Sequence, residues 1–137
     1  DVRVAVVRDG TILLVQQKGE DAWSLPGGWV DIDTSLREAA VKEAREEAGA
    51  DVRPEKLIAV LDRRKQDLGF FPYAVVSAYI GCSMAGDLTF RDNTETAAAR
   101  FFPVDSLPPL SVMRTNRDLI LLCHRSMIER WSHTIFD

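Results

Sequence analysis

A glycine-rich turn that runs into an acidic helix is the feature that most constrains this chain. Residues 27–50 read GGWVDIDTSLREAAVKEAREEAGA. Ser35 and Glu38 have the spacing of a capping box, and Gly49 suits the residue that ends a helix. We therefore expect a helix from Ser35 to Ala48. Such a turn and helix can hold a metal ion and a phosphate together.

Glutamates gather near the end of this helix. Glu43, Glu46 and Glu47 fall within about a 100° arc of one helix face, because positions three and four apart are neighbours. Their mutual repulsion costs a few tenths of a kcal/mol per pair, so a cation would stabilise the cluster. Oxygen ligands of this kind favour Mg²⁺ or Mn²⁺. A solvated charged face is the alternative reading, and the spacing alone leaves the two equally open.

The remaining helix residues predict where these carboxylates lie. Val41, Ala44 and Ala48 form an apolar stripe that should face the core. Burial of this stripe would leave the carboxylates at the edge of a cleft, and Lys42 would pair with Glu46 one turn on.

The stretch resembles the sequence box of the Nudix hydrolases, G-x5-E-x7-R-E-U-x-E-E-x-G-U, in which U is aliphatic. Leu25 to Gly28 matches the usual lead-in to this box. Thr34 stands where the family has its first Glu, and Lys42 stands where it has Arg. Aligned from Gly28, the pattern is otherwise matched by Glu43, Glu46, Glu47 and Gly49.

The resemblance covers the whole chain and implies an α/β fold, an α/β/α sandwich with a central mixed sheet. From residue patterns we expect strands at 2–7, 11–16, 56–62, 71–80 and 100–103, and a second helix from about 115 to 131. A chain of 137 residues can bury one core, so residues 1–137 should form a single Nudix domain. Relatives in the branch that this chain resembles often carry a small extra N-terminal domain, which would lie ahead of Asp1.

The same resemblance implies an activity. Bacterial relatives in this branch act on ADP-ribose or CDP-choline, so we expect metal-dependent hydrolysis of the pyrophosphate bond in a nucleoside diphosphate linked to another moiety. The alternative is a weakened module that only binds a nucleotide sugar, as a sensor.

The resemblance also implies roles for particular residues. Glu43, Glu46 and Glu47, with a backbone carbonyl near Gly28, would hold the metal. Glu95, on a loop before a late strand, would take a proton from the attacking water, and Glu47 is the other candidate for that base. A solvated loop is the plain alternative for Glu95.

A basic turn follows the strand expected at 56–62. Arg63 and Arg64 are candidates for binding substrate phosphates, although a basic turn is usually just solvated.

Composition limits the partners. The formal net charge of −4 argues against general nucleic-acid binding, which needs a basic surface. Apolar runs fall well short of the roughly 18 residues of a membrane helix, so we expect a soluble, cytoplasmic protein with a small-molecule nucleotide substrate.

Cys82 and Cys123 are far apart and should be reduced, partly buried thiols. The apolar tail Trp131 to Phe136 would dock on the same chain or on a second subunit, forming a homodimer.

Overall fold

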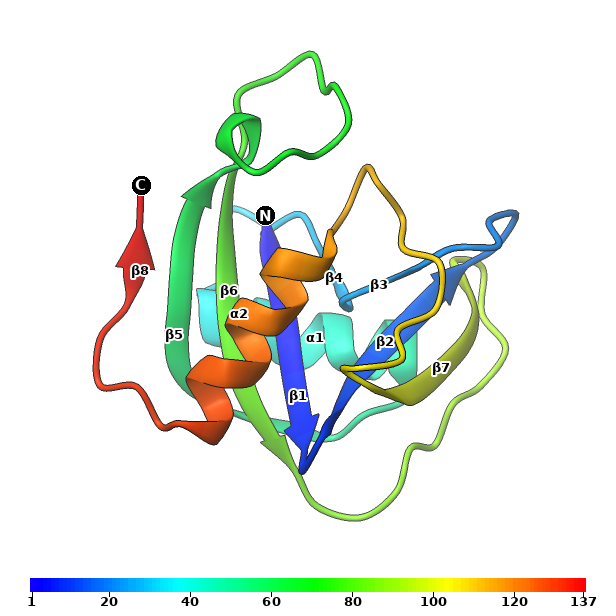
Figure 1. Ribbon diagram of the computed structural model, residues 1–137. Helices are drawn as coiled ribbons and strands as arrows, with labels where there is room; N and C mark the ends of the chain where they lie inside the picture. Colours follow the sequence, from blue (N-terminus) through cyan, green and yellow to red (C-terminus); the bar gives the residue numbers. More distant parts are fainter.

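A mixed β-sheet lies between two helices in the computed structural model, which describes residues 1–137 (Figure 1). The helices are α1 (Leu36–Ala48) and α2 (Arg117–Ile128), with a short 3₁₀ helix, η1 (Arg63–Lys65). The strands are β1 (Val2–Arg8), β2 (Thr11–Gln17), β3 (Trp23–Ser24), β4 (Gly27–Gly28), β5 (Val52–Asp62), β6 (Val76–Met84), β7 (Thr96–Pro103) and β8 (Ile135–Phe136).

The sheet has the strand order β3-β2-β1-β6-β5-β8, with β4 paired to β1 and β7 paired to β2. The central pair β1 and β6 is parallel, whereas β5 runs antiparallel to β6. In Figure 1, α2 crosses the near face of this sheet and α1 lies behind it. The predicted α/β/α sandwich with a central mixed sheet is confirmed.

Each helix covers its own half of the core. Side chains alternate between the two faces of a strand, so Val2, Val4 and Val6 of β1 all face α1. They pack there against the helix's small residues, Ala39, Ala40, Ala44 and Ala48. On the other face, Leu119 and Ile120 of α2 pack in a cluster that includes Ala5, Ile12 and Leu14.

The helix that carries the glutamates begins and ends as predicted. The Ser35 hydroxyl accepts from the Glu38 N–H at 3.2 Å, and the Glu38 carboxylate accepts from the Ser35 N–H at 2.9 Å. Gly49 has φ 62°, and its N–H donates to the Arg45 carbonyl at 3.0 Å. These contacts satisfy backbone groups that a helix end otherwise leaves unpaired.

The buried face of α1 differs from the predicted one. Val41 is only half-buried, and alanines form the apolar contact with the sheet. Glu43 and Glu47 lie on the same buried face, so two of the three carboxylates are buried instead of standing at an edge. Lys42 pairs with Asp31, at 3.0 Å between Nζ and Oδ2, and not with Glu46.

The strand predicted at 71–80 was wrong at its start, since β6 begins at Val76. Pro72 has no N–H to donate to a ladder, and Phe71 packs under the Arg63 guanidinium, 5.1 Å from the ring centroid. At the other end, β6 continues past residue 80 to Met84.

Other boundaries moved for local reasons. The strands predicted at 56–62 and 100–103 begin earlier, at Val52 and Thr96. Pro54 is accommodated in β5 beside a register shift. The second helix is shorter than 115–131, because the Asn116 side chain caps it by accepting from the Leu119 N–H at 2.9 Å.

The C-terminal tail docks on the same chain. Ile135 and Phe136 pair in parallel with Ala59 and Val60 of β5 and extend the sheet at its outer edge. The helices of this structure are too short and too polar to cross a bilayer.

Both cysteine thiols should resist labelling in the folded protein. Cys82 and Cys123 are free and buried, and burial raises the pKa of each thiol to about 12. The thiolate is the reactive form, so at about pH 8 we expect almost no reaction with Ellman's reagent. Both thiols should react once denaturant unfolds the chain. Rapid labelling of the native protein would contradict the buried positions.

Candidate active site

A cleft of about 450 Å³ opens beside the glycine turn and α1. Six of the predicted site residues line it: Gly28, Glu43, Glu46, Glu47, Arg63 and Glu95. Residues that the sequence analysis did not single out for the site also line it, among them Asp1, Arg3, Gln17, Trp29, Asp31 and Arg114. The cleft therefore joins segments from both ends and the middle of the chain.

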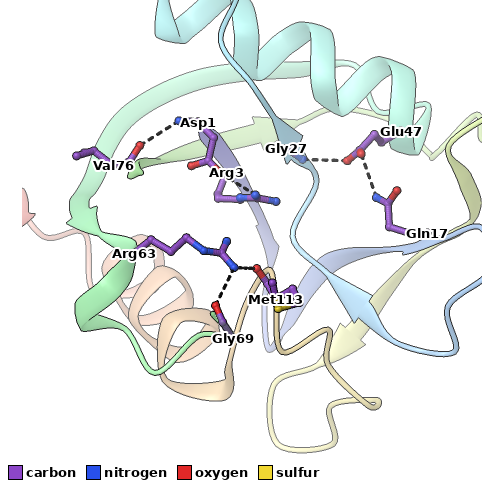
Figure 2. A network of polar contacts seen from close by, with 9 residues as sticks. All are labelled: Asp1, Arg3, Gln17, Gly27, Glu47, Arg63, Gly69, Val76 and Met113. Carbon is purple, nitrogen blue, oxygen red and sulfur yellow. Dashed lines mark hydrogen bonds and ion pairs between the residues drawn. The ribbon is translucent and has the colours of Figure 1, made fainter. Parts of the chain in front are cut away.

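Glu47 is the most firmly held carboxylate of the cleft. It is 3% exposed and accepts from the Gly27 N–H at 2.9 Å and from the Gln17 side-chain amide at 3.1 Å (Figure 2). Burial raises its pKa, and these two hydrogen bonds oppose that rise. Glu47 thereby connects α1 with β4 and β2.

Glu43 lies one helical turn before Glu47 and faces the glycine turn. A Cβ placed on Gly28 would lie 2.9 Å from the Glu43 Oε1, so a larger residue there would displace this carboxylate. Burial, followed by repulsion from Glu47 and Glu46, raises the pKa of Glu43 to about 7. Glu46 is exposed at the cleft wall.

Glu95 stands on a turn that is fixed to α1. The Asn93 side-chain oxygen accepts from the N–H groups of Glu95 and Thr96 at 2.9 and 2.8 Å. The Thr96 hydroxyl donates to the Glu47 carbonyl at 2.7 Å. The turn therefore holds the exposed Glu95 carboxylate at the cleft, where it adds to the field that raises the pKa of Glu43.

Arginines form a second charged group in the cleft. Arg3 is buried on β1 and donates to Asp1 at 2.6 Å, while its Nη1 has no hydrogen-bond partner. Arg63 reaches from the end of β5 to the carbonyls of Met113 and Gly69 (Figure 2), and its Nε also has no partner. Burial lowers the pKa of Arg63, and repulsion from Arg3 and Arg114 lowers it further.

Arg64 does not line the cleft. Its side chain is exposed and donates to Asp62, at 3.0 Å from Nε to Oδ1. Of the two predicted phosphate-binding arginines, the structure therefore brings only Arg63 to the carboxylates.

The carboxylates do not converge as a finished metal site. No group of three or more His, Cys, Asp or Glu side chains is close enough together to enclose an ion. Glu47 points its oxygens at two N–H donors, which accounts for part of this spread. The donor set nevertheless fits a hard divalent cation, because Glu43, Glu46, Glu47 and Glu95 offer only oxygens to the cleft.

Arg3 was missed as a cleft residue in the sequence analysis, although its place in the sequence is unusual for a charged side chain. It lies within the apolar run Val2 to Val7, and a charged side chain at a buried strand position is rare unless it is paired or functional. Arg114 and Gln17 carried no comparable local signal, because they reach the cleft only through the fold.

Comparison with known proteins identifies the family. A sequence model of the NUDIX domain matches residues 1–123, so the chain belongs to the Nudix family. It is 42% identical, over all 137 residues, to a Bacillus subtilis protein named "Putative ADP-ribose pyrophosphatase YjhB". The chain spans 65% of that relative's length.

Two crystal structures share the fold closely. An ADP-ribose pyrophosphatase from Streptococcus suis 89-1591 superposes with a TM-score of 0.86 at 39% identity, covering 99% of this chain and 96% of that one. A UDP-X diphosphatase superposes with a TM-score of 0.88 at 33% identity, covering 99% of this chain and 65% of that one.

Substitution of Gly27 by alanine should destabilise the protein. A Cβ at this position, where φ is 157°, would collide with the Val2 carbonyl oxygen and press on Arg3 at 3.1 Å. We expect Gly27→Ala to lower the free energy of unfolding by at least about 1 kcal/mol, measured by urea denaturation. Gly10→Ala is the matched control, since nothing lies within 4 Å of its added Cβ. Equal stability of the two variants would contradict the close approach of β4 to β1.

Proposed function

We propose that this protein hydrolyses the pyrophosphate bond of a nucleoside diphosphate linked to a second moiety, with Mg²⁺ or Mn²⁺ as cofactor. The products would be a nucleoside monophosphate and a phosphorylated second moiety. The observation that carries this proposal is the meeting of four glutamates, Glu43, Glu46, Glu47 and Glu95, with three arginines, Arg3, Arg63 and Arg114, in one cleft.

Such a cleft suits a diphosphate. Glu43, Glu46 and Glu47, with the Gly28 carbonyl, would hold a divalent cation. The chemistry that this cation supplies when bound is neutralisation of phosphate charge and activation of water. On the arginine side, the Nη1 of Arg3 and the Nε of Arg63 still lack acceptors, and phosphate oxygens are strong acceptors for guanidinium groups.

Glu95 is the proposed base that takes a proton from the attacking water. It is exposed at the cleft, and its turn is held by the Asn93 side-chain oxygen, which accepts from the N–H groups of Glu95 and Thr96. Glu47 is less suited to this role, because both of its oxygens already accept hydrogen bonds.

We infer that ADP-ribose is the preferred one of the two substrate types. Both substrates carry the same diphosphate, so the arginines of the cleft could contact either one. The names of the Bacillus subtilis and Streptococcus suis relatives agree with this preference.

A substrate panel tests the proposed reaction. ADP-ribose, CDP-choline, a UDP-sugar and several nucleoside triphosphates are incubated with the protein, with and without Mg²⁺ or Mn²⁺, and products are identified by mass spectrometry. We expect AMP and ribose 5-phosphate from ADP-ribose only when a divalent ion is present. Preferred release of pyrophosphate from triphosphates would place the substrate in another class, and binding without turnover would indicate a sensor.

The same assay includes a matched pair of variants. Glu46→Gln should remove most turnover without loss of stability, because it removes a proposed ligand and relieves like-charge repulsion. Glu55→Gln, an exposed glutamate outside the cleft, should behave as the parent protein.

Glu95→Gln should reduce kcat by about 10² to 10⁴, the usual contribution of a general base. KM, the metal concentration at half-maximal activity and the Tm should stay nearly unchanged, and the acid limb of the pH–rate profile should weaken. A normal kcat of the Glu95→Gln variant would indicate that Glu47 is the general base. A lower Tm together with lower activity would instead indicate that Glu95 stabilises the 93–96 turn.

A further inference from the structure

Exposed aromatic side chains form a cluster at the mouth of the cleft. Trp29 is 62% exposed and Tyr73 is 70% exposed, and Phe71 lies between them. The Phe71 ring centroid is 6.1 Å from that of Trp29 and 5.9 Å from that of Tyr73. Trp29 and Phe71 both line the cleft that holds the carboxylates. Large aromatic groups at water-filled clefts are favoured positions for ligand contact.

The indole of Trp29 is placed next to the reacting end of the cleft. Trp29 directly follows Gly28, whose backbone lies against the Glu43 carboxylate, and neighbouring Cα atoms are about 3.8 Å apart. The loop that carries Trp29 is tied down by the ion pair of Asp31 with Lys42 of α1 and by the Thr34 N–H, which donates to the Asp31 carbonyl at 3.0 Å. The ring is therefore presented on an anchored segment.

The three rings are not equally available. The Arg63 guanidinium lies over the Phe71 ring, so Phe71 serves mainly to support its neighbours. The ring planes of Trp29 and Phe71 meet at 41°, so Phe71 leaves much of the indole surface open. A flat, uncharged ligand group could stack there with little desolvation cost.

We propose that Trp29 is the surface on which the base of the nucleotide substrate stacks, with Phe71 and Tyr73 as its support. This proposal rests on the proposed function, since it requires a nucleoside in the cleft. Aromatic cages also bind quaternary ammonium groups. A base suits this site better, because the Arg63 guanidinium already lies over the Phe71 ring. Every base has a π-face, so AMP and CMP should both bind.

Tryptophan fluorescence tests the proposal without any turnover. In buffer with Mg²⁺, the protein is titrated with AMP, CMP, ribose 5-phosphate and phosphocholine. AMP and CMP should quench the emission. Trp131→Phe should preserve the quenching, since Trp131 stacks on His133 and does not line the cleft. Trp29→Phe should abolish most of the quenching while retaining part of the affinity.

Calorimetric titration of Trp29→Ala provides the decisive comparison. We expect the Kd for AMP to rise about 5- to 150-fold, as for loss of one base-stacking ring, while the Kd for ribose 5-phosphate and the Tm stay unchanged. An equal loss of affinity for ribose 5-phosphate would overturn the proposal, because it would show a general distortion of the cleft. The proposal would also be overturned if the parent protein bound phosphocholine more tightly than AMP and Trp29→Ala lost that preference. That result would indicate an ammonium-binding cage.

Failure of the stacking proposal is separable from failure of the proposed function. Absence of quenching by AMP at concentrations on the order of 1 mM overturns the stacking role, even if ADP-ribose is hydrolysed. Quenching that depends on Trp29 supports the stacking role, even if no substrate of the panel is turned over.

Discussion

The buried carboxylate of Glu47 is the contact on which the cleft depends. Burial of a charged group is costly unless hydrogen bonds replace its lost water, and Gly27 and Gln17 supply two of them. The backbone of the same residue accepts from the Thr96 hydroxyl. One glutamate thus joins α1 to β2, β4 and the start of β7, and it fixes where the glycine turn and the 93–96 turn stand relative to the helix.

Charges of both signs line the cleft of this acidic protein. The carboxylates repel one another, and so do Arg3, Arg63 and Arg114, while Arg3 and Arg114 attract Glu47. In the proposed reaction, a divalent cation would stabilise the carboxylates, and phosphate oxygens would stabilise the arginines. A basic outer surface is unnecessary, in keeping with the net charge of −4.

Local signals predicted the helix and its glutamates well, because caps and helical periodicity involve residues only a few positions apart. The cleft wall could not be predicted in this way. Arg3 and Arg114 come from opposite ends of the chain, and no periodicity relates them. Arg63 and Arg64 are neighbours in sequence, yet the turn of η1 sends one into the cleft and the other to Asp62. The start of β6 was missed because Phe71 packs against a side chain from another element.

The Arg63 side chain also joins two loops that are distant in sequence. It donates to Gly69 and to Met113, and the Gly69 N–H donates to the Val112 carbonyl at 2.8 Å. A side chain at Gly69 would strike the Met113 sulfur. Grafting one of these loops from a homologue would therefore leave it against an unmatched partner. Exchange of both loops together should preserve these contacts, so the two segments form one structural unit.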